Sequence, residues 1–245
     1  MAAIEPSRER NHRTCSLHVQ KTLCRDLVHG VVEVIQMGES TAPPHHRGPA
    51  VTTHDTYHHG DLRNALERAA LELVEEKGAE NFSLSEAARR AGVSASAPYK
   101  HFAERDALLA AIAAKGHRFH YGMLRTALAG VTDPAEVMRI VNEVFLTFAV
   151  EQHAFYQASY WSRLDPDRYP ELLAAYKKVV DVADAAAAML RSDPAEAKEL
   201  AVACGALRYG FASTFIFDRE RPMGESLAIA RRQLGRATLA MVERY

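Results

Sequence analysis

Residues 82–106 constrain the fold more than any other stretch, because two short helical patterns follow each other there with only a tight turn between them. Ser83 and Glu86 have the spacing of a capping box, in which each side chain accepts the backbone N–H of the other residue. Gly92 adopts a positive φ at little cost, so it is expected to end this first helix.

The second helix of the motif is predicted from Ser94, as its N-cap, through Phe102, a length of about eight residues. Pro98 falls in its first turn, where a missing backbone N–H costs little. Two helices joined by a short glycine-containing turn form the helix-turn-helix that lays its second helix in the major groove of DNA. The alternative is a helical hairpin in an ordinary bundle, with Tyr99 and His101 as solvated surface.

The expected reading helix combines small residues at its start with polar groups at and beyond its end. Small side chains would let the backbone approach base edges closely, and the polar groups can bind phosphates. The small residues are Ser94, Ala95, Ser96 and Ala97, and the phosphate-binding candidates are Tyr99, Lys100, His101 and Arg105.

Residues 82–109, with the preceding helix predicted from Asp61 to Lys77, resemble the DNA-binding domain of the TetR family of bacterial repressors. The residues that carry the resemblance are Gly78, Phe82, Ala88, Gly92, Val93, Ser94, Tyr99, His101, Phe102, Leu108 and Leu109. It implies that Tyr99, His101 and Arg105 bind phosphates, that residues 94–97 face the bases, and that Ser83 and Ser85 also lie at the DNA. Ser85 stands where many members carry arginine, so weaker contact from the first helix is expected.

One branch of this family has a distinctive C-terminal domain with a Trp-His-Gly signature. The Tyr-His-His-Gly-Asp-Leu-Arg segment at 57–63 and the Ala-Pro-Tyr-Lys-His-Phe segment at 97–102 resemble that branch. The signature itself is imperfect, because Arg208, Tyr209 and Gly210 stand where it would lie.

Charge and composition are those of an ordinary globular protein. The net charge is −1, with 48% hydrophobic and 25% charged residues, which argues against bulk binding of polyanions. Around the motif the two signs are expected to be separated, with Glu72 and Glu76 at the far end of the first helix and Arg89 and Arg90 near the turn. No signal peptide is apparent, and the most apolar window, 201–217, is interrupted by Arg208, so a cytoplasmic protein without a membrane span is expected.

Residues 1–56 do not resemble the family and are expected to be a disordered tail and linker, and 1–36 could be an upstream misreading of the start codon before Met37. The linker composition begins at Gly38. Several histidines gather near it, but no second cluster with ligand spacing appears, so no metal site is expected. These histidines are His45, His46, His54, His58 and His59.

The rest of the chain reads as helices without a strand pattern, so an all-α fold is predicted. A long helix from Glu104 to about Ala129 would leave the DNA-binding domain at 57–118 and enter a helical effector-binding and dimerisation domain at 119–245. Its inward face is expected to hold Leu108, Leu109, Ile112, Phe119 and Met123. Asp133, Pro134 and Glu136 form a clear helix start. A further helix is expected to hold Phe155, Tyr156, Tyr160 and Trp161, and others are expected near 170–190, 194–217 and 224–244.

An aromatic set in this second domain is expected to line a mainly apolar effector pocket. Its members are Phe145, Phe148, Phe155, Tyr156, Tyr160, Trp161, Tyr176 and Phe211. Ordinary core packing is the alternative for each of them taken singly. No catalytic motif, cofactor motif or phosphate-binding loop is found, so an enzyme is not expected.

The last two helices are expected to form an isologous four-helix interface between two copies of the chain, because 194–217 is apolar on nearly every side. A monomeric bundle core is the alternative. The resulting hypothesis is a homodimeric repressor that binds a palindromic operator in double-stranded DNA and is released by a small-molecule effector. A DNA-binding protein that is independent of ligands or controlled by a partner is the other hypothesis.

Overall fold

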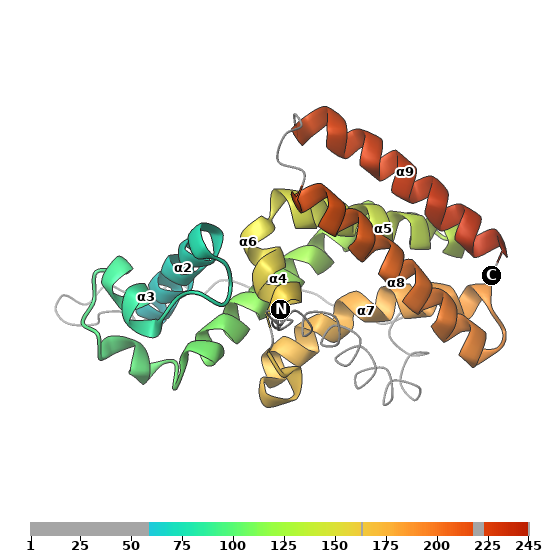
Figure 1. Cartoon of the computed structure of the whole chain (residues 1–245). Helices are drawn as coiled ribbons and strands as arrows, with labels where there is room; N and C mark the ends of the chain where they lie inside the picture. Colours follow the sequence, from blue (N-terminus) through green and yellow to red (C-terminus); the bar gives the residue numbers. More distant parts are fainter. Residues whose placement is uncertain (1–58, 163, 218–222, 245) are drawn as a thin grey trace, which may run out of the picture. The chain divides into compact units, whose positions relative to one another are not determined.

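The computed structural model describes residues 59–162, 164–217 and 223–244, and every regular element in these ranges is helical (Figure 1). The predicted all-α class is confirmed. The elements are α2 (His59–Lys77), α3 (Leu84–Arg90), the 3-10 helix η2 (Ala97–Lys100), α4 (Arg105–Ala127), α5 (Pro134–Glu151), α6 (His153–Tyr156), the π-helix η3 (Gln157–Trp161), the 3-10 helix η4 (Pro166–Arg168), α7 (Pro170–Leu190), α8 (Pro194–Phe217) and α9 (Met223–Arg244). The predictions for residues 1–56 lie outside the described residues.

In the N-terminal part, α2 packs against α3 and against the first half of α4 (Figure 1). We call the part of the chain from α2 to the first half of α4 the head, and η2 belongs to it. Its helix ends follow the local sequence. Gly78 ends α2 with a φ of 86°, and Gly92 ends α3 with a φ of 73°, both as expected for glycine at these positions. The predicted start of α2 is corrected, because the helix begins at His59, so Asp61 lies within its first turn and is not its N-cap.

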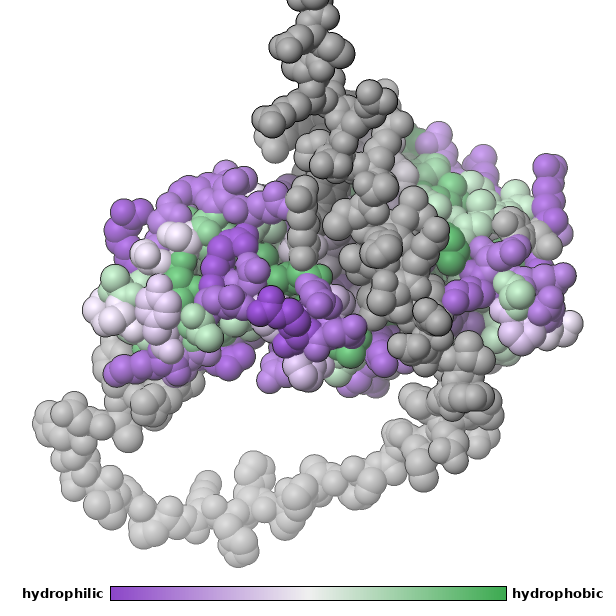
Figure 2. Space-filling model, turned by 60° about the horizontal axis from the view of Figure 1, so that its bottom comes forward, coloured by the Kyte–Doolittle hydropathy of each residue, from purple (hydrophilic) through white to green (hydrophobic). Residues whose placement is uncertain are grey.

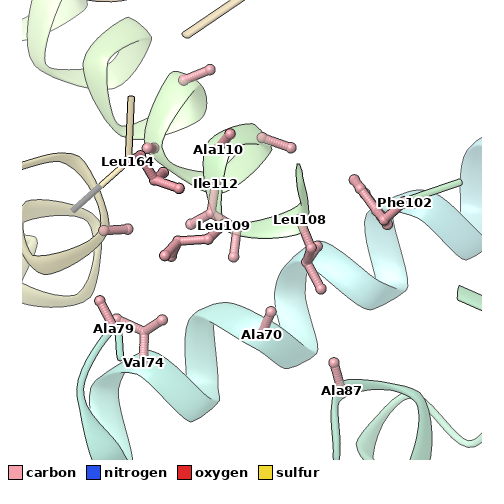
Figure 3. Close-up of a cluster of buried hydrophobic side chains, with 14 of the residues drawn as sticks. Ala70, Val74, Ala79, Ala87, Phe102, Leu108, Leu109, Ala110, Ile112 and Leu164 are labelled. Atoms are coloured by element: carbon pink, nitrogen blue, oxygen red, sulfur yellow. The ribbon is translucent and has the colours of Figure 1, made fainter. Parts of the chain in front are cut away.

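The core of the head is continuous with residues from much later in the chain. Leu66, Phe82 and Leu109 are at most 5% exposed, and the same cluster includes Leu164 and Leu172, which lie beyond the π-helix (Figure 3). The expected domain boundary between residues 118 and 119 falls inside α4, which runs without a break through both parts.

The inward face of α4 differs in one respect from the prediction. Leu108, Leu109 and Ile112 are buried as expected, but Phe119 is 45% exposed. The buried positions beyond Ile112 include His117 and His120. Neighbouring helical residues point about 100° apart, so burying His120 turns Phe119 towards the surface.

The second half is a helical bundle in which α5 packs against α7, α8 and α9. The start of α5 is as predicted, with Pro134 at the first helical position and the Asp133 carboxylate accepting the backbone N–H of Ala135 at 3.2 Å. The single helix expected around Phe155–Trp161 is instead the short α6 continued by a π-helix. Within the described ranges, no helix combines the length and the hydropathy needed to cross a bilayer.

Candidate functional sites

The turn of the helix-turn-helix is built as the sequence predicts. The Ser83 Oγ accepts the backbone N–H of Glu86 at 3.2 Å, and the Glu86 carboxylate accepts the backbone N–H of Ser83 at 3.0 Å. The Lys77 ammonium, 2.5 Å from Glu86, and the Ser83 donors hold the pKa of Glu86 below its ordinary value. The Ser83 hydroxyl is therefore engaged in the cap, whereas Ser85 is exposed.

The reading segment is shorter than predicted. An α-helix from Ser94 through Phe102 was expected, but the helical residues are Ala97–Lys100 and their bonding is 3-10. Pro98 explains this, because it has no N–H to donate to the carbonyl of Ser94 in an α-helical bond. The N–H of Ala97 donates to that carbonyl instead, at 3.0 Å, which tightens the turn.

The proposed base-reading residues lie on the surface. Ser94, Ala95 and Ser96 are exposed and Ala97 is half-buried. Of the phosphate-binding candidates, Tyr99 is 60% exposed and Lys100 is exposed, whereas His101 is half-buried. Over the head, at the left of Figure 2, hydrophilic and apolar side chains alternate and do not form one uniformly hydrophilic face. Such a surface suits close approach with few phosphate contacts.

Arg105 is held inside the head. Its Nε donates to the carbonyl of Phe82 at 3.0 Å, and a second nitrogen donates to the carbonyl of Ala79. A third nitrogen pairs with Asp106 at 2.7 Å, and the guanidinium lies 4.9 Å from the centre of the Phe82 ring. These contacts fix the loop after α2 onto the start of α4, and they engage three of the five N–H donors of the guanidinium within the head.

The expected separation of charges around the motif is wrong. Arg90 forms a bidentate pair with Glu76, at 2.6 and 2.7 Å, so the two signs meet between α2 and α3. Lys77 and Glu86 pair across the same two helices. The sequence pattern missed this because it compared positions along the chain, whereas α2 and α3 lie side by side.

Most of the predicted aromatic set gathers in one cluster. Phe145, Phe148 and Tyr156 are at most 1% exposed, and the Tyr160 ring centre lies 5.1 Å from that of Phe145. Phe155, Tyr176 and Phe211 are half-buried at its edges, and the side chain of Trp161 lies outside the described residues. Tyr209 belongs to the cluster too, 4.9 Å from Phe145, although the predicted set did not contain it.

Two buried histidines on α4 are the main residues that the sequence interpretation missed. His117 and His120 are at most 1% exposed, and burial lowers the pKa of each to about 3, so both rings are neutral near pH 7. The His120 Nδ1 lies 3.0 Å from the Tyr160 hydroxyl, while its Nε2 has no hydrogen-bond partner. Their spacing of three residues on an otherwise apolar helix face was the available signal.

Arg208 of α8 lies against the same aromatic cluster. Its Cζ is 5.4 Å from the centre of the Phe145 ring, and one terminal nitrogen is 3.4 Å from the amide oxygen of Asn142. Asn142 is fully buried and donates to the Thr238 hydroxyl of α9 at 2.9 Å. The Nε of Arg208 is buried without a hydrogen-bond partner. Positive charge and unsatisfied donors therefore meet in the interior of the bundle.

The outer sides of α8 and α9 are less covered than an apolar helix requires. Val202 of α8 is 41% exposed and Ile229 of α9 is 42% exposed. Ala206 and Gly210 continue the exposed stripe of α8 at intervals of four residues, so its surface is apolar and nearly flat.

Comparison with known proteins places these features in a family. Residues 67–112 match the family described as bacterial regulatory proteins, tetR family. No curated protein sequence matches the chain. A bacterial regulatory protein of the tetR family from Rhodococcus RHA1 has a similar structure, with a TM-score of 0.59, 18% identity, and coverage of 74% of this chain and 96% of that one.

Two further similar structures contain coenzyme A thioesters. FadR from Bacillus subtilis, in complex with stearoyl-CoA, has a TM-score of 0.60 at 11% identity, over 73% of this chain and 98% of that one. AibR, in complex with isovaleryl coenzyme A and operator DNA, has a TM-score of 0.55 at 16% identity, over 74% and 97% of the two chains. At these identities the similarity establishes the shared fold.

Proposed function

We propose that this chain, which belongs to the tetR family of bacterial regulatory proteins, is a homodimeric repressor that leaves its operator when a small molecule binds in the second half of the chain. The observation that carries the proposal is the exposed reading segment. Ser94, Ala95 and Ser96 present small side chains next to Tyr99 and Lys100, on a turn fixed by the Ser83–Glu86 capping box. Small residues beside hydrogen-bonding groups suit contact with both base edges and phosphates.

The proposed DNA contacts are Ser85 and residues 94–97 at the bases, with Tyr99, Lys100 and His101 at phosphates. We leave Arg105 and the Ser83 hydroxyl out of this surface, because both are engaged within the head. Selection of bound sequences from a random DNA library tests the proposal. A palindromic consensus with half-sites about 34–36 Å apart would support a dimeric reader, and recovery of no consensus would oppose it.

The effector site is proposed at the cluster of Phe145, Tyr160, His120 and Arg208. Buried donors without partners are unusual in a finished core and are common where a ligand binds. FadR and AibR share this fold and form complexes with coenzyme A thioesters, which supports a small-molecule effector for this chain.

The π-helix offers a physical link from this cluster to the head. Tyr160 contacts His120 on one side, and the Ser159 hydroxyl donates to the carbonyl of Ala113 in α4 at 3.1 Å. Gly116 approaches Ser159 so closely that a Cβ there would lie 2.4 Å from its hydroxyl oxygen. A ligand that moves Tyr160 would therefore move η3 against α4, and it shifts the equilibrium only by its difference in affinity for the two arrangements. A fully ligand-independent DNA binder would show no change in DNA affinity in any effector screen.

We expect Lys100→Gln to weaken binding to operator and to unrelated DNA alike, because the ammonium is proposed to contact a phosphate and not a base. The logarithm of the binding constant falls linearly with the logarithm of the salt concentration, and the magnitude of that slope should decrease by about 1 for each phosphate that the ammonium no longer neutralises. Lys178→Gln, which removes an exposed lysine from α7, is the control and should leave the slope unchanged. An unchanged slope in titrations of Lys100→Gln across salt would remove Lys100 from the phosphate-binding residues.

We expect Ala206→Glu to convert the dimer to a monomer, because it would place one carboxylate from each copy in the proposed α8–α9 interface. A buried charge without a partner costs several kcal/mol, so the dissociation constant should rise by at least about 100-fold. Sedimentation velocity measures this, and Lys178→Glu on α7 is the control for added negative charge. A monomeric wild-type chain, or a dimer that tolerates the substitution, would place the interface elsewhere.

A further inference from the structure

The Arg208 guanidinium is half-buried and has few partners for a charged group that lies against aromatic rings. It has five N–H donors, of which the structure gives one a long hydrogen bond, 3.4 Å to the amide oxygen of Asn142. Its Nε is buried with no partner, and it forms no ion pair with any residue that the structure describes. The Phe145 and Tyr209 rings lie 5.4 and 5.9 Å from its Cζ.

A second polar group without a partner, the His120 Nε2, belongs to a ring that contacts the same Phe145 side chain. The His120 ring centre is 5.8 Å from that of Phe145 and 4.7 Å from that of Phe148. If the His120 Nδ1 accepts the proton of the Tyr160 hydroxyl, the neutral ring carries its own proton on Nε2, the buried atom that has no partner. Arg208 and His120 thus both lie next to Phe145, each with a buried nitrogen that has no hydrogen-bond partner.

We propose that this corner binds the carboxylate of an organic acid, with Arg208 and His120 as its donors and Phe145, Tyr160 and Tyr209 against the apolar body. A planar guanidinium forms two parallel hydrogen bonds with a carboxylate, and such charged bonds are the strong ones in a dry site. Asn142 would hold the guanidinium in place, because its own amide is anchored to Thr238. The inference rests on the effector role proposed above and specifies the chemical class of that effector.

The test uses the full chain and a panel of hexanoate, octanoate, benzoate and phenylacetate, each with its primary amide. Calorimetry should find at least one acid that binds and whose amide binds at least about 10-fold more weakly, as expected when a charged pair is removed. Arg208→Met should weaken the binding of that acid by a similar factor. Arg125→Met, at an exposed position on α4, should change its dissociation constant by less than about twofold. Equal binding of acids and amides, or no acid binding at all, would overturn the inference, as would binding only of the matching coenzyme A thioesters.

A measurement without ligand separates recognition from a purely structural role. Arg208→Met removes a half-buried charge whose Nε has no partner, so the melting temperature of the free protein should stay level or rise. A clear fall would mean that Arg208 serves the core, which would overturn the inference. DNA binding by the same preparations tests the regulator itself: its absence would overturn the proposed function, whereas retained DNA binding with no acid preference overturns only the carboxylate site.

Discussion

Replacing Ala95 with glutamate is expected to abolish specific DNA binding while the protein stays folded and dimeric. Ala95 is exposed in the turn that begins the reading segment, between Ser94 and Ser96, so the new carboxylate meets no buried group in the free protein. Against DNA it would lie beside base edges and phosphates, where like charge costs several kcal/mol. Operator affinity should fall by at least about 100-fold, a loss of about 2.8 kcal/mol, in a fluorescence anisotropy titration.

Ala95→Gln is the matched variant, because glutamine has nearly the size of glutamate without its charge. It should lose much less affinity than Ala95→Glu, which would attribute the effect to electrostatic repulsion. If Ala95→Glu still bound the selected operator tightly, the reading surface would have to lie elsewhere on the head. Equal losses for the two variants would instead point to a steric clash.

The second large effect is expected from Arg105→Ala, and it is an effect on stability. The side chain donates to the carbonyls of Phe82 and Ala79, pairs with Asp106 and stacks on the Phe82 ring. Hydrogen bonds from charged groups contribute about 1.5–3 kcal/mol each, and two carbonyls would lose their donor. We expect the free energy of unfolding to fall by about 2–3 kcal/mol, or about 5–10 °C in melting temperature for a chain of this size.

Arg105→Lys distinguishes this role from phosphate binding. Lysine keeps the positive charge but cannot bond both carbonyls in the same geometry, so it should lose stability as well. A phosphate ligand would behave differently: the lysine variant would keep most of the DNA affinity, and neither variant would lose stability. Melting curves together with the salt dependence of DNA binding decide between the two roles.

The local sequence predicted those helix ends that depend only on neighbouring residues in the chain. Ser83, Glu86 and Gly92 determine where α3 begins and ends, and Asp133 with Pro134 does the same for the start of α5. These signals act within a few residues, through capping bonds and a positive φ, so they can be recognised without knowing the fold.

The errors arose where bonding geometry or distant contacts decided the outcome. Pro98 was correctly expected to be tolerated, but its missing N–H converts the reading segment to 3-10 bonding. The internal contacts of Arg105 were not foreseen, because the carbonyls that hold it come from a loop more than twenty residues earlier. Its phosphate contact stays a prediction, which the Arg105→Lys variant tests.

In the second half of the chain, the sequence predicted the aromatic cluster but not the polar residues that lie within it. The aromatic residues stood out because large apolar side chains mark a core, and most of them do cluster. His117 and His120 did not stand out, because a single histidine on a helix is polar in any hydropathy pattern. Only the observed orientation of α4, with Phe119 outside and His120 inside, brings the two rings to the aromatic cluster.

The core that joins Leu66, Phe82 and Leu109 to Leu164 and Leu172 makes the head a poor candidate for an independent module. A fragment ending with α4 would leave that apolar surface open to water and to other fragments. A head moved from one protein of this fold to another would thus need matched changes around Leu164 and Leu172, because the helical bundle that receives it completes the core of the head. Changing Ser94, Ala95 and Ser96, the exposed residues of the proposed reading surface, leaves that core intact, so we expect it to be an easier route to a new DNA specificity than transplanting the whole unit.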